Sequence, residues 1–281
     1  MNGKQENWRT AERRVSYETT GIRGIASDTP LSLIAAWIAY VAMIACNFAF
    51  ESLRLGGVTT AEVSNQVFVW FAPAGYAFAI WGLIYLALGV WLVALTNGEL
   101  RYGRSAKTPC LLFVATCALN VAWLALFHFQ HIALSLAVII VYWGVVALLY
   151  ANVQVPGKKL ILRAPISLYL GWLSVASIIN ATNLMTRAFG SIAIVDEVST
   201  ILLSIVVLSI GFAMAKLAKD YIYPAVLLWA TVAVGVHLID VNVYVAAAVF
   251  TMCALGALAT YLPVERLKLR KKDEGTRVTQ A

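Results

Sequence analysis

Apolar residues form blocks of about twenty along most of the chain, and short polar segments separate the blocks. A transmembrane helix needs about 20 apolar residues, because each residue advances ~1.5 Å through a hydrocarbon layer ~30 Å thick. The pattern therefore predicts an all-α fold, a polytopic membrane helical bundle with about eight transmembrane helices. The predicted helices cover residues 31–50, 74–95, 109–129, 132–153, 160–182, 198–216, 221–238 and 241–262.

Charged residues are too scarce for a water-soluble globule. They make up 12% of the 281 residues, whereas soluble domains carry roughly 25%. The net charge of +7 does not indicate nucleic-acid binding, because no water-exposed domain with a basic face is predicted. Residues 1–30 are mixed in sign and lack an apolar core, so they are expected to form a cytoplasmic tail and not a cleavable signal peptide.

Basic residues are distributed unevenly between the two sides of the predicted bundle. With eight spans, 19 of the 21 Lys and Arg residues fall on the side that holds both termini, and only Arg54 and Arg187 fall on the other. Because Lys and Arg stay on the cytoplasmic side of membranes, both termini are predicted to be cytoplasmic. The absence of a targeting segment favours a bacterial inner (plasma) membrane. The basic cytoplasmic tail, residues 263–281, is expected to contact membrane lipids.

Ionisable side chains, which an enzyme inside a membrane requires, are nearly absent from the predicted spans. His237 and Asp240 could together bind a metal or transfer protons, but their position in a short turn favours a solvated hairpin end. No hydrolase, metalloprotease or phosphate-binding motif occurs. The sequence therefore predicts no enzyme, no catalytic residue and no metal site. Four cysteines are expected to pack as small apolar residues without disulfides: Cys46, Cys110, Cys117 and Cys253.

Aromatic and amide side chains recur at steps of three and four residues in three predicted helices, which places each set on one helix face. By the predicted topology, the three faces converge in the outer half of the bilayer. An aromatic pocket with amide groups suits a flat, apolar ligand with a few polar groups. Two simpler explanations stay open, because aromatic residues gather at membrane interfaces and asparagine can bridge two helices. The candidate ligand-binding residues are Trp81, Tyr85, Asn120, Trp123, Phe127, Tyr169, Trp172, Ala176 and Asn180.

Three segments carry a more specific signal. Residues 73–85 resemble the motif Pro-Pro-x-Trp…Val-Trp-x-x-Leu-Tyr, and residues 118–127 resemble Leu-Asn-x-x-Trp-x-x-x-Phe. Residues 169–180 resemble Tyr-Leu-Ala-Trp-x-x-x-Ala-x-x-x-Asn. These motifs occur, in this order, on the second, third and fifth helices of the translocator protein family, also called TspO or tryptophan-rich sensory proteins. The chain is therefore similar to that family over a five-helix unit.

The resemblance implies a TspO-like ligand-binding unit over residues 31–185. Such a unit binds tetrapyrroles such as protoporphyrin IX or haem, and also sterol-like molecules, and it requires no cofactor. The loop after the first helix, residues 51–72 here, would close the pocket as a lid. Gly75 departs from the family, which has tryptophan at that position, so one wall of the pocket is changed. Residues 186–262 add three transmembrane helices that a five-helix family lacks.

The function that these features favour is a membrane receptor or carrier for a flat apolar ligand. The alternative is a secondary transporter built on the same helical unit, although only Pro165 and Pro224 could interrupt helices and no internal repeat is visible. Tetrapyrrole-modifying activity is a third interpretation, because the substrate itself could supply the reactivity. The expected partners are membrane lipids and a small apolar ligand, and homodimerisation is left open.

Overall fold

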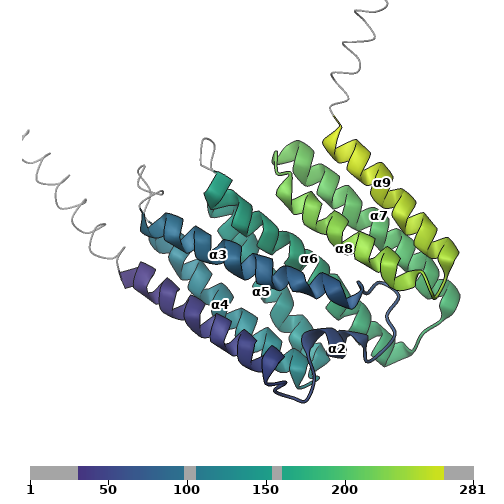
Figure 1. Ribbon diagram of the computed structural model, residues 1–281, viewed down its shortest axis with the longest axis horizontal. Helices are drawn as coiled ribbons and strands as arrows, with labels where there is room; N and C mark the ends of the chain where they lie inside the picture. The colour runs from purple at the N-terminus through teal and green to yellow at the C-terminus, as the bar shows by residue number, and fades with distance from the viewer. Residues whose placement is uncertain (1–30, 98–105, 154–159, 263–281) are drawn as a thin grey trace, which may run out of the picture. The chain divides into compact units, whose positions relative to one another are not determined.

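The computed structural model describes residues 31–97, 106–153 and 160–262, and all regular structure in these ranges is helical (Figure 1). The first helix is Leu31–Ser52. The helices that follow are α2 (Thr60–Asn65), the 3-10 helix η1 (Gly75–Ala79), α3 (Ile80–Thr96), α4 (Lys107–His128), α5 (Ile132–Val153), α6 (Leu160–Phe189), α7 (Ala193–Leu217), α8 (Ile222–Leu238) and α9 (Val243–Tyr261).

The predicted polytopic helical bundle is confirmed. Among the described residues, seven helices are long and apolar enough to cross a membrane, counting η1 and α3 as one continuous span. The remaining predicted span, residues 221–238, corresponds to α8, which has 17 residues and lies at the short end of the range for transmembrane helices. The predicted bounds of α5 agree with the structure to the residue.

The chain forms two compact units that share α6. Unit 1 contains the described residues up to Val63 together with Ala79–Leu173, and unit 2 contains Ser64–Phe78 together with the described residues from Ser174 onward. The sequence predicted a different division, near residue 185, between a ligand-binding part and three additional helices. That division concerns function, and it stays a prediction.

In unit 1, α4 and α5 form a closely packed helical hairpin (Figure 1). The first helix is packed more loosely. Only 17% of its apolar stretch is buried, which is the lowest share among the seven long helices. Two polar contacts join it to α3. Tyr40 Oη donates a hydrogen bond to the carbonyl oxygen of Tyr85 (2.9 Å), and Trp37 Nε1 donates to Thr96 Oγ1 (3.0 Å). Interhelical hydrogen bonds of this kind contribute to helix association where no hydrophobic driving force operates.

In unit 2, α7, α8 and α9 pack against one another, and the segment Ser64–Phe78 packs on α8 (Figure 1). The backbone N–H of Ala74 donates to the carbonyl oxygen of Ala233 (2.9 Å), and Trp229 Nε1 donates to the carbonyl oxygen of Ala77 (3.4 Å). The second predicted span, residues 74–95, agrees with the continuous span Gly75–Thr96, in which the 3-10 helix η1 leads into α3 at Ile80.

The fifth predicted span ended too early at residue 182. α6 continues to Phe189, and two polar residues of its last turns bond to the segment Ser64–Phe78. Asn183 Nδ2 donates to the carbonyl oxygen of Ser64 (3.2 Å), and Arg187 bonds to Asn183 Oδ1 (2.7 Å) and Gln66 Oε1 (3.1 Å). These contacts extend the helix beyond the end of its apolar run.

Replacing Gly211 in α7 with valine should destabilise unit 2. A Cβ at Gly211 would lie 3.1 Å from Pro224 Cβ, and the rigid proline ring of α8 has little freedom to move away. Overpacking of this kind costs roughly 1–3 kcal/mol. The unfolding midpoint of the protein in nanodiscs should therefore fall. Gly144→Val is the matched control, because a Cβ at Gly144 meets no atom within 4 Å, and equal effects of both changes would contradict the packing argument.

Candidate functional site

Trp81 lies at the centre of an aromatic cluster in unit 1. Its ring stacks on Tyr85 of the same helix, with centroids 5.5 Å apart and planes 22° apart, and lies 5.9 Å from the ring of Trp123 in α4. The rings of Tyr169 and Trp172 in α6 meet it edge-on, each with its centroid 6.4 Å away. Side chains from three helices that are far apart in sequence therefore meet at one indole ring.

The cluster continues along α4 and toward α5. Trp123 stacks on Phe127 at 5.4 Å, and both are buried. Tyr142 in α5 packs edge-on against Tyr169, and their hydroxyl groups are hydrogen-bonded. Tyr142 was not among the predicted site residues, because its helix lacks the aromatic and amide stripe of the other three.

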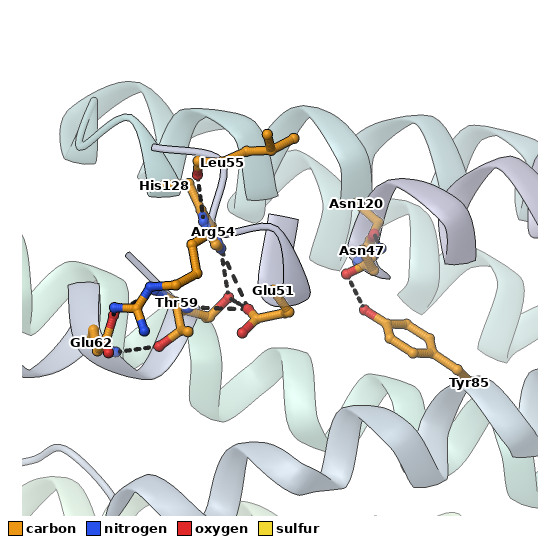
Figure 2. A network of polar contacts seen from close by, with 10 residues as sticks. Asn47, Glu51, Arg54, Leu55, Thr59, Glu62, Tyr85, Asn120 and His128 are labelled. Carbon is orange, nitrogen blue, oxygen red and sulfur yellow. Dashed lines mark hydrogen bonds and ion pairs between the residues drawn. The ribbon is translucent and has the colours of Figure 1, made fainter. Parts of the chain in front are cut away.

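Asn47 of the first helix is hydrogen-bonded to one residue of α3 and one residue of α4 (Figure 2). Asn47 Oδ1 accepts a hydrogen bond from Tyr85 Oη (2.6 Å), and Asn47 Nδ2 donates to Asn120 Oδ1 (2.7 Å). Asn47 and Asn120 are both buried. This triad fixes the orientation of the Asn120 amide and of the Tyr85 ring, because each uses its only oxygen in a bond to Asn47.

Two buried N–H donors of the cluster have no hydrogen-bond partner among the described residues. They are Trp123 Nε1 and Asn120 Nδ2, on side chains that are 3% and 0% exposed. Leaving such a donor unpaired costs about 1–3 kcal/mol, so buried polar groups are normally satisfied. Both donors belong to α4 and lie one helical turn apart, so one ligand with hydrogen-bond acceptors could reach both.

Seven of the nine predicted ligand-binding residues lie in unit 1 and take part in this arrangement. Ala176 and Asn180 continue the same face of α6 beyond Leu173, and both are buried, but they belong to unit 2. A role for these two residues in ligand binding stays a prediction.

A groove of about 460 Å³ lies elsewhere in unit 1, between the first helix and α3. None of the predicted ligand-binding residues lines it. Its lining residues are Trp37, Tyr40, Leu86, Gly89, Val90, Val93, Ala94, Asn97 and Ile161.

Residues 53–63 follow the first helix in unit 1, and this segment is called the lid below. Thr59 and Glu62 form a capping box that starts α2, because Glu62 Oε2 accepts from the N–H of Thr59 (2.9 Å) and Thr59 Oγ1 accepts from the N–H of Glu62 (3.2 Å). Arg54 Nη2 lies 2.5 Å from Glu62 Oε2. The Thr59 N–H and then the Arg54 guanidinium lower the pKa of the Glu62 carboxyl. The lid therefore has an internal structure of its own.

The lid is tied to the end of α4 through His128, whose side chain is buried (Figure 2). His128 Nε2 lies 3.0 Å from Thr60 Oγ1 and 3.4 Å from Glu51 Oε1, and His128 Nδ1 lies 3.2 Å from the carbonyl oxygen of Leu55. This role of His128 was not predicted from the sequence. A histidine that ends a helix beside a short turn resembles a solvated side chain, and only the fold brings the lid against it.

The turn that contains His237 and Asp240 differs in one respect from the solvated hairpin end that was predicted there. Asp240 is exposed, as expected for a hairpin end, but His237 is only partly exposed and stacks on Phe68 at 5.1 Å. No group of three or more His, Cys, Asp or Glu residues that could hold a metal ion is present in residues 31–97, 106–153 and 160–262. The cysteines Cys46, Cys110, Cys117 and Cys253 are free.

The departure at Gly75 is accompanied by an aromatic contact in unit 2. Tyr76, which follows Gly75, packs edge-on against Trp229 of α8, with ring centroids 5.4 Å apart. An aromatic pair that includes a residue of the last three helices therefore stands next to the position where translocator proteins have tryptophan.

Comparison with curated proteins and with solved structures finds no match. The chain does match the family described as TSPO-like protein over residues 33–262. The match continues beyond residue 185, where the predicted five-helix unit ends, and includes α7, α8 and α9. The match covers most of the chain, and the chain therefore belongs to the TSPO-like family of integral membrane proteins.

Proposed function

We propose that the protein is a membrane receptor or carrier of the translocator type, which binds a flat apolar ligand such as a porphyrin or haem, or a sterol-like molecule, at the aromatic cluster of unit 1. The observation that carries this proposal is the pair of unpartnered buried donors, Trp123 Nε1 and Asn120 Nδ2, within a cluster of aromatic rings. The rings favour a flat apolar body, and the donors favour a ligand with hydrogen-bond acceptors.

A tetrapyrrole fits both requirements better than a sterol does. Its macrocycle offers a large π-face, and its carboxylates and ring nitrogens are acceptors, whereas a sterol offers one hydroxyl group. Ionisable groups are scarce around the cluster, so binding without chemical conversion is the simplest role for it. The bound molecule is then a ligand and not a cofactor of a reaction.

Access to the cluster requires movement, because the rings of Trp81, Trp123 and Trp172 lie against one another. A ligand must separate these rings and insert between them. The lid and the first helix are the parts of unit 1 best suited to move, since the first helix is the least buried of the long helices. With both termini cytoplasmic, the lid would face the outside and the cluster would lie in the outer half of a bacterial inner membrane.

Titration with protoporphyrin IX in nanodiscs tests this proposal through quenching of tryptophan fluorescence. The wild-type protein should show saturable quenching. The double variant Asn120→Ala/Trp123→Phe should bind about tenfold more weakly, because a loss of ~1.4 kcal/mol changes affinity tenfold. The control is Trp143→Phe, an exposed tryptophan of α5 outside the cluster, which should leave affinity unchanged. Weak, linear quenching that is the same in all three proteins would contradict the proposal.

A secondary transporter is the second candidate function, and the segment Ser64–Phe78 is the feature that favours it. Transporters often place non-helical backbone at membrane depth, where it must be satisfied by neighbouring protein. The hydrogen bond from Ala74 N–H to the carbonyl oxygen of Ala233 within α8 is an example of such pairing. Ligand-dependent flux into sealed vesicles that contain the protein, and not into empty vesicles, would favour the transporter over a receptor.

A further inference from the structure

His128 lies at a junction of three segments of unit 1: the end of the first helix, the lid and the end of α4 (Figure 2). Thr60 of the lid contacts both Glu51 of the first helix and His128 of α4. Its N–H donates to Glu51 Oε1 (3.1 Å), and its hydroxyl bonds to the same carboxyl group and to His128 Nε2 (3.0 Å). A Cβ at Gly56 of the lid would lie 3.0 Å from the carbonyl oxygen of His128, so the backbones also approach closely.

The hydrogen bonds at this junction require a definite number of protons. The carbonyl oxygen of Leu55 can only accept, so His128 Nδ1 carries a hydrogen. Thr60 Oγ1 bonds to both Glu51 and His128 Nε2, and these two bonds need two hydrogens. The Thr60 hydroxyl supplies one. The other must sit on His128 Nε2 or on the Glu51 carboxyl, so the closed junction holds one additional proton.

Loss of this proton weakens the junction. When it leaves, one of the two bonds to Thr60 loses its hydrogen, and a lone pair of His128 Nε2 then faces an anionic oxygen of Glu51 at 3.4 Å. The other groups around His128 do not replace the proton. The ring of Phe50 packs against the imidazole at 5.1 Å, and the charged groups of the lid, Arg54 and Glu62, pair with each other.

We propose that His128, Glu51 and Thr60 form a proton-dependent latch that holds the lid closed and thereby sets the rate at which ligand enters and leaves the aromatic cluster. The control of ligand exchange rests on the proposed function, whereas closure of the lid does not. The latch and the cluster share two helices. Glu51 follows Asn47 by one turn of the first helix, and His128 follows Phe127 in α4.

Hydrogen–deuterium exchange of the lid amides, without ligand, tests closure. The reporters are the amides of Gly57, Thr60 and Val63, which are hydrogen-bonded in the closed lid. Thr60→Val removes the bridging hydroxyl at nearly constant shape and should accelerate lid exchange about tenfold at low pH, as expected for the loss of about one hydrogen bond. The ratio of the variant's exchange rate to the wild-type rate should shrink as the pH rises, because the wild-type latch then loses its additional proton.

In the His128→Gln background, the effect of Thr60→Val on lid exchange should no longer depend on pH, because glutamine cannot hold the additional proton. The control is His131→Gln, an exposed histidine three residues further along, which should leave the pH profile of the wild type unchanged. A wild-type lid whose exchange equals that of Thr60→Val at every pH would overturn the latch.

Ligand exchange is measured separately with protoporphyrin IX. The dissociation rate should rise about as much as lid exchange in Thr60→Val, while His131→Gln stays like the wild type. Equal dissociation rates in wild type and Thr60→Val would overturn the control of ligand exchange. Absence of protoporphyrin binding would instead refute the proposed function, and the exchange data would still decide whether the latch exists.

Discussion

Replacing Asn47 with leucine should strongly destabilise unit 1 and disorganise the aromatic cluster. The change leaves Tyr85 Oη and Asn120 Oδ1 without the partners that hold them at 2.6 and 2.7 Å. Each buried polar group left unsatisfied costs about 1–3 kcal/mol. Because the Asn120 amide would also lose its fixed orientation, affinity for protoporphyrin IX should fall together with stability.

The effect is measured by thermal unfolding and by ligand titration of the same nanodisc sample. Asn152→Leu in α5 is the matched control. The Asn152 amide donates to the carbonyl oxygen of Leu148 in its own helix (2.8 Å), so no interhelical bond is lost. If Asn47→Leu and Asn152→Leu had equal, small effects, the triad would not be a structural centre of the site.

Replacing Gly56 with valine should displace the lid. Gly56 has a φ of +93°, which is unfavourable for any residue with a Cβ and most of all for a β-branched one. A side chain there would also press against the carbonyl oxygen of His128, at 3.0 Å from the Cβ. Backbone strain alone costs about 1–3 kcal/mol, and the clash adds to it. Amides of the lid should then exchange faster at every pH.

Gly57→Val separates the two causes. Gly57 also has a positive φ, of +81°, but a Cβ there meets no atom within 4 Å. It should loosen the lid through strain alone and therefore less than Gly56→Val does. A larger effect at Gly57 than at Gly56 would show that the lid does not rest against the end of α4.

The membrane helices could be predicted from sequence because each must satisfy its own backbone in lipid, so an apolar run of fixed length is both necessary and visible. The errors fall where tertiary contacts replace that rule. α6 ends later than predicted because Asn183 bonds to Ser64 and Arg187 bonds to Gln66. These bonded residues lie more than 100 positions apart in the sequence, so no local pattern predicts the contacts.

The residues of the candidate site were likewise predicted where a local pattern exists and missed where only tertiary contacts define them. Steps of three and four residues placed Trp81, Asn120 and Trp123 on single helix faces, and the structure brings these faces together. Tyr142 and His128 were missed because neither belongs to a series of aromatic and amide residues at steps of three and four. Their importance comes from partners on other helices, namely Tyr169 for the first and the lid for the second.

The two arginines that depart from the distribution of basic residues also have structural roles. Arg54 pairs with Glu62 inside the lid, and Arg187 bonds to Asn183 and Gln66 in unit 2. The sequence shows both only as exceptions to a charge rule.

Fluorine NMR of the protein labelled with fluorotryptophan tests most directly whether the aromatic cluster takes the ligand. The nine tryptophans can be assigned by single Trp→Phe variants. On saturation with protoporphyrin IX, the resonances of Trp81 and Trp123 should shift, while those of Trp37 at the groove and Trp229 in unit 2 should not. Shifts at Trp37 or Trp229, with Trp81 and Trp123 unchanged, would contradict the assignment of the ligand site to the cluster.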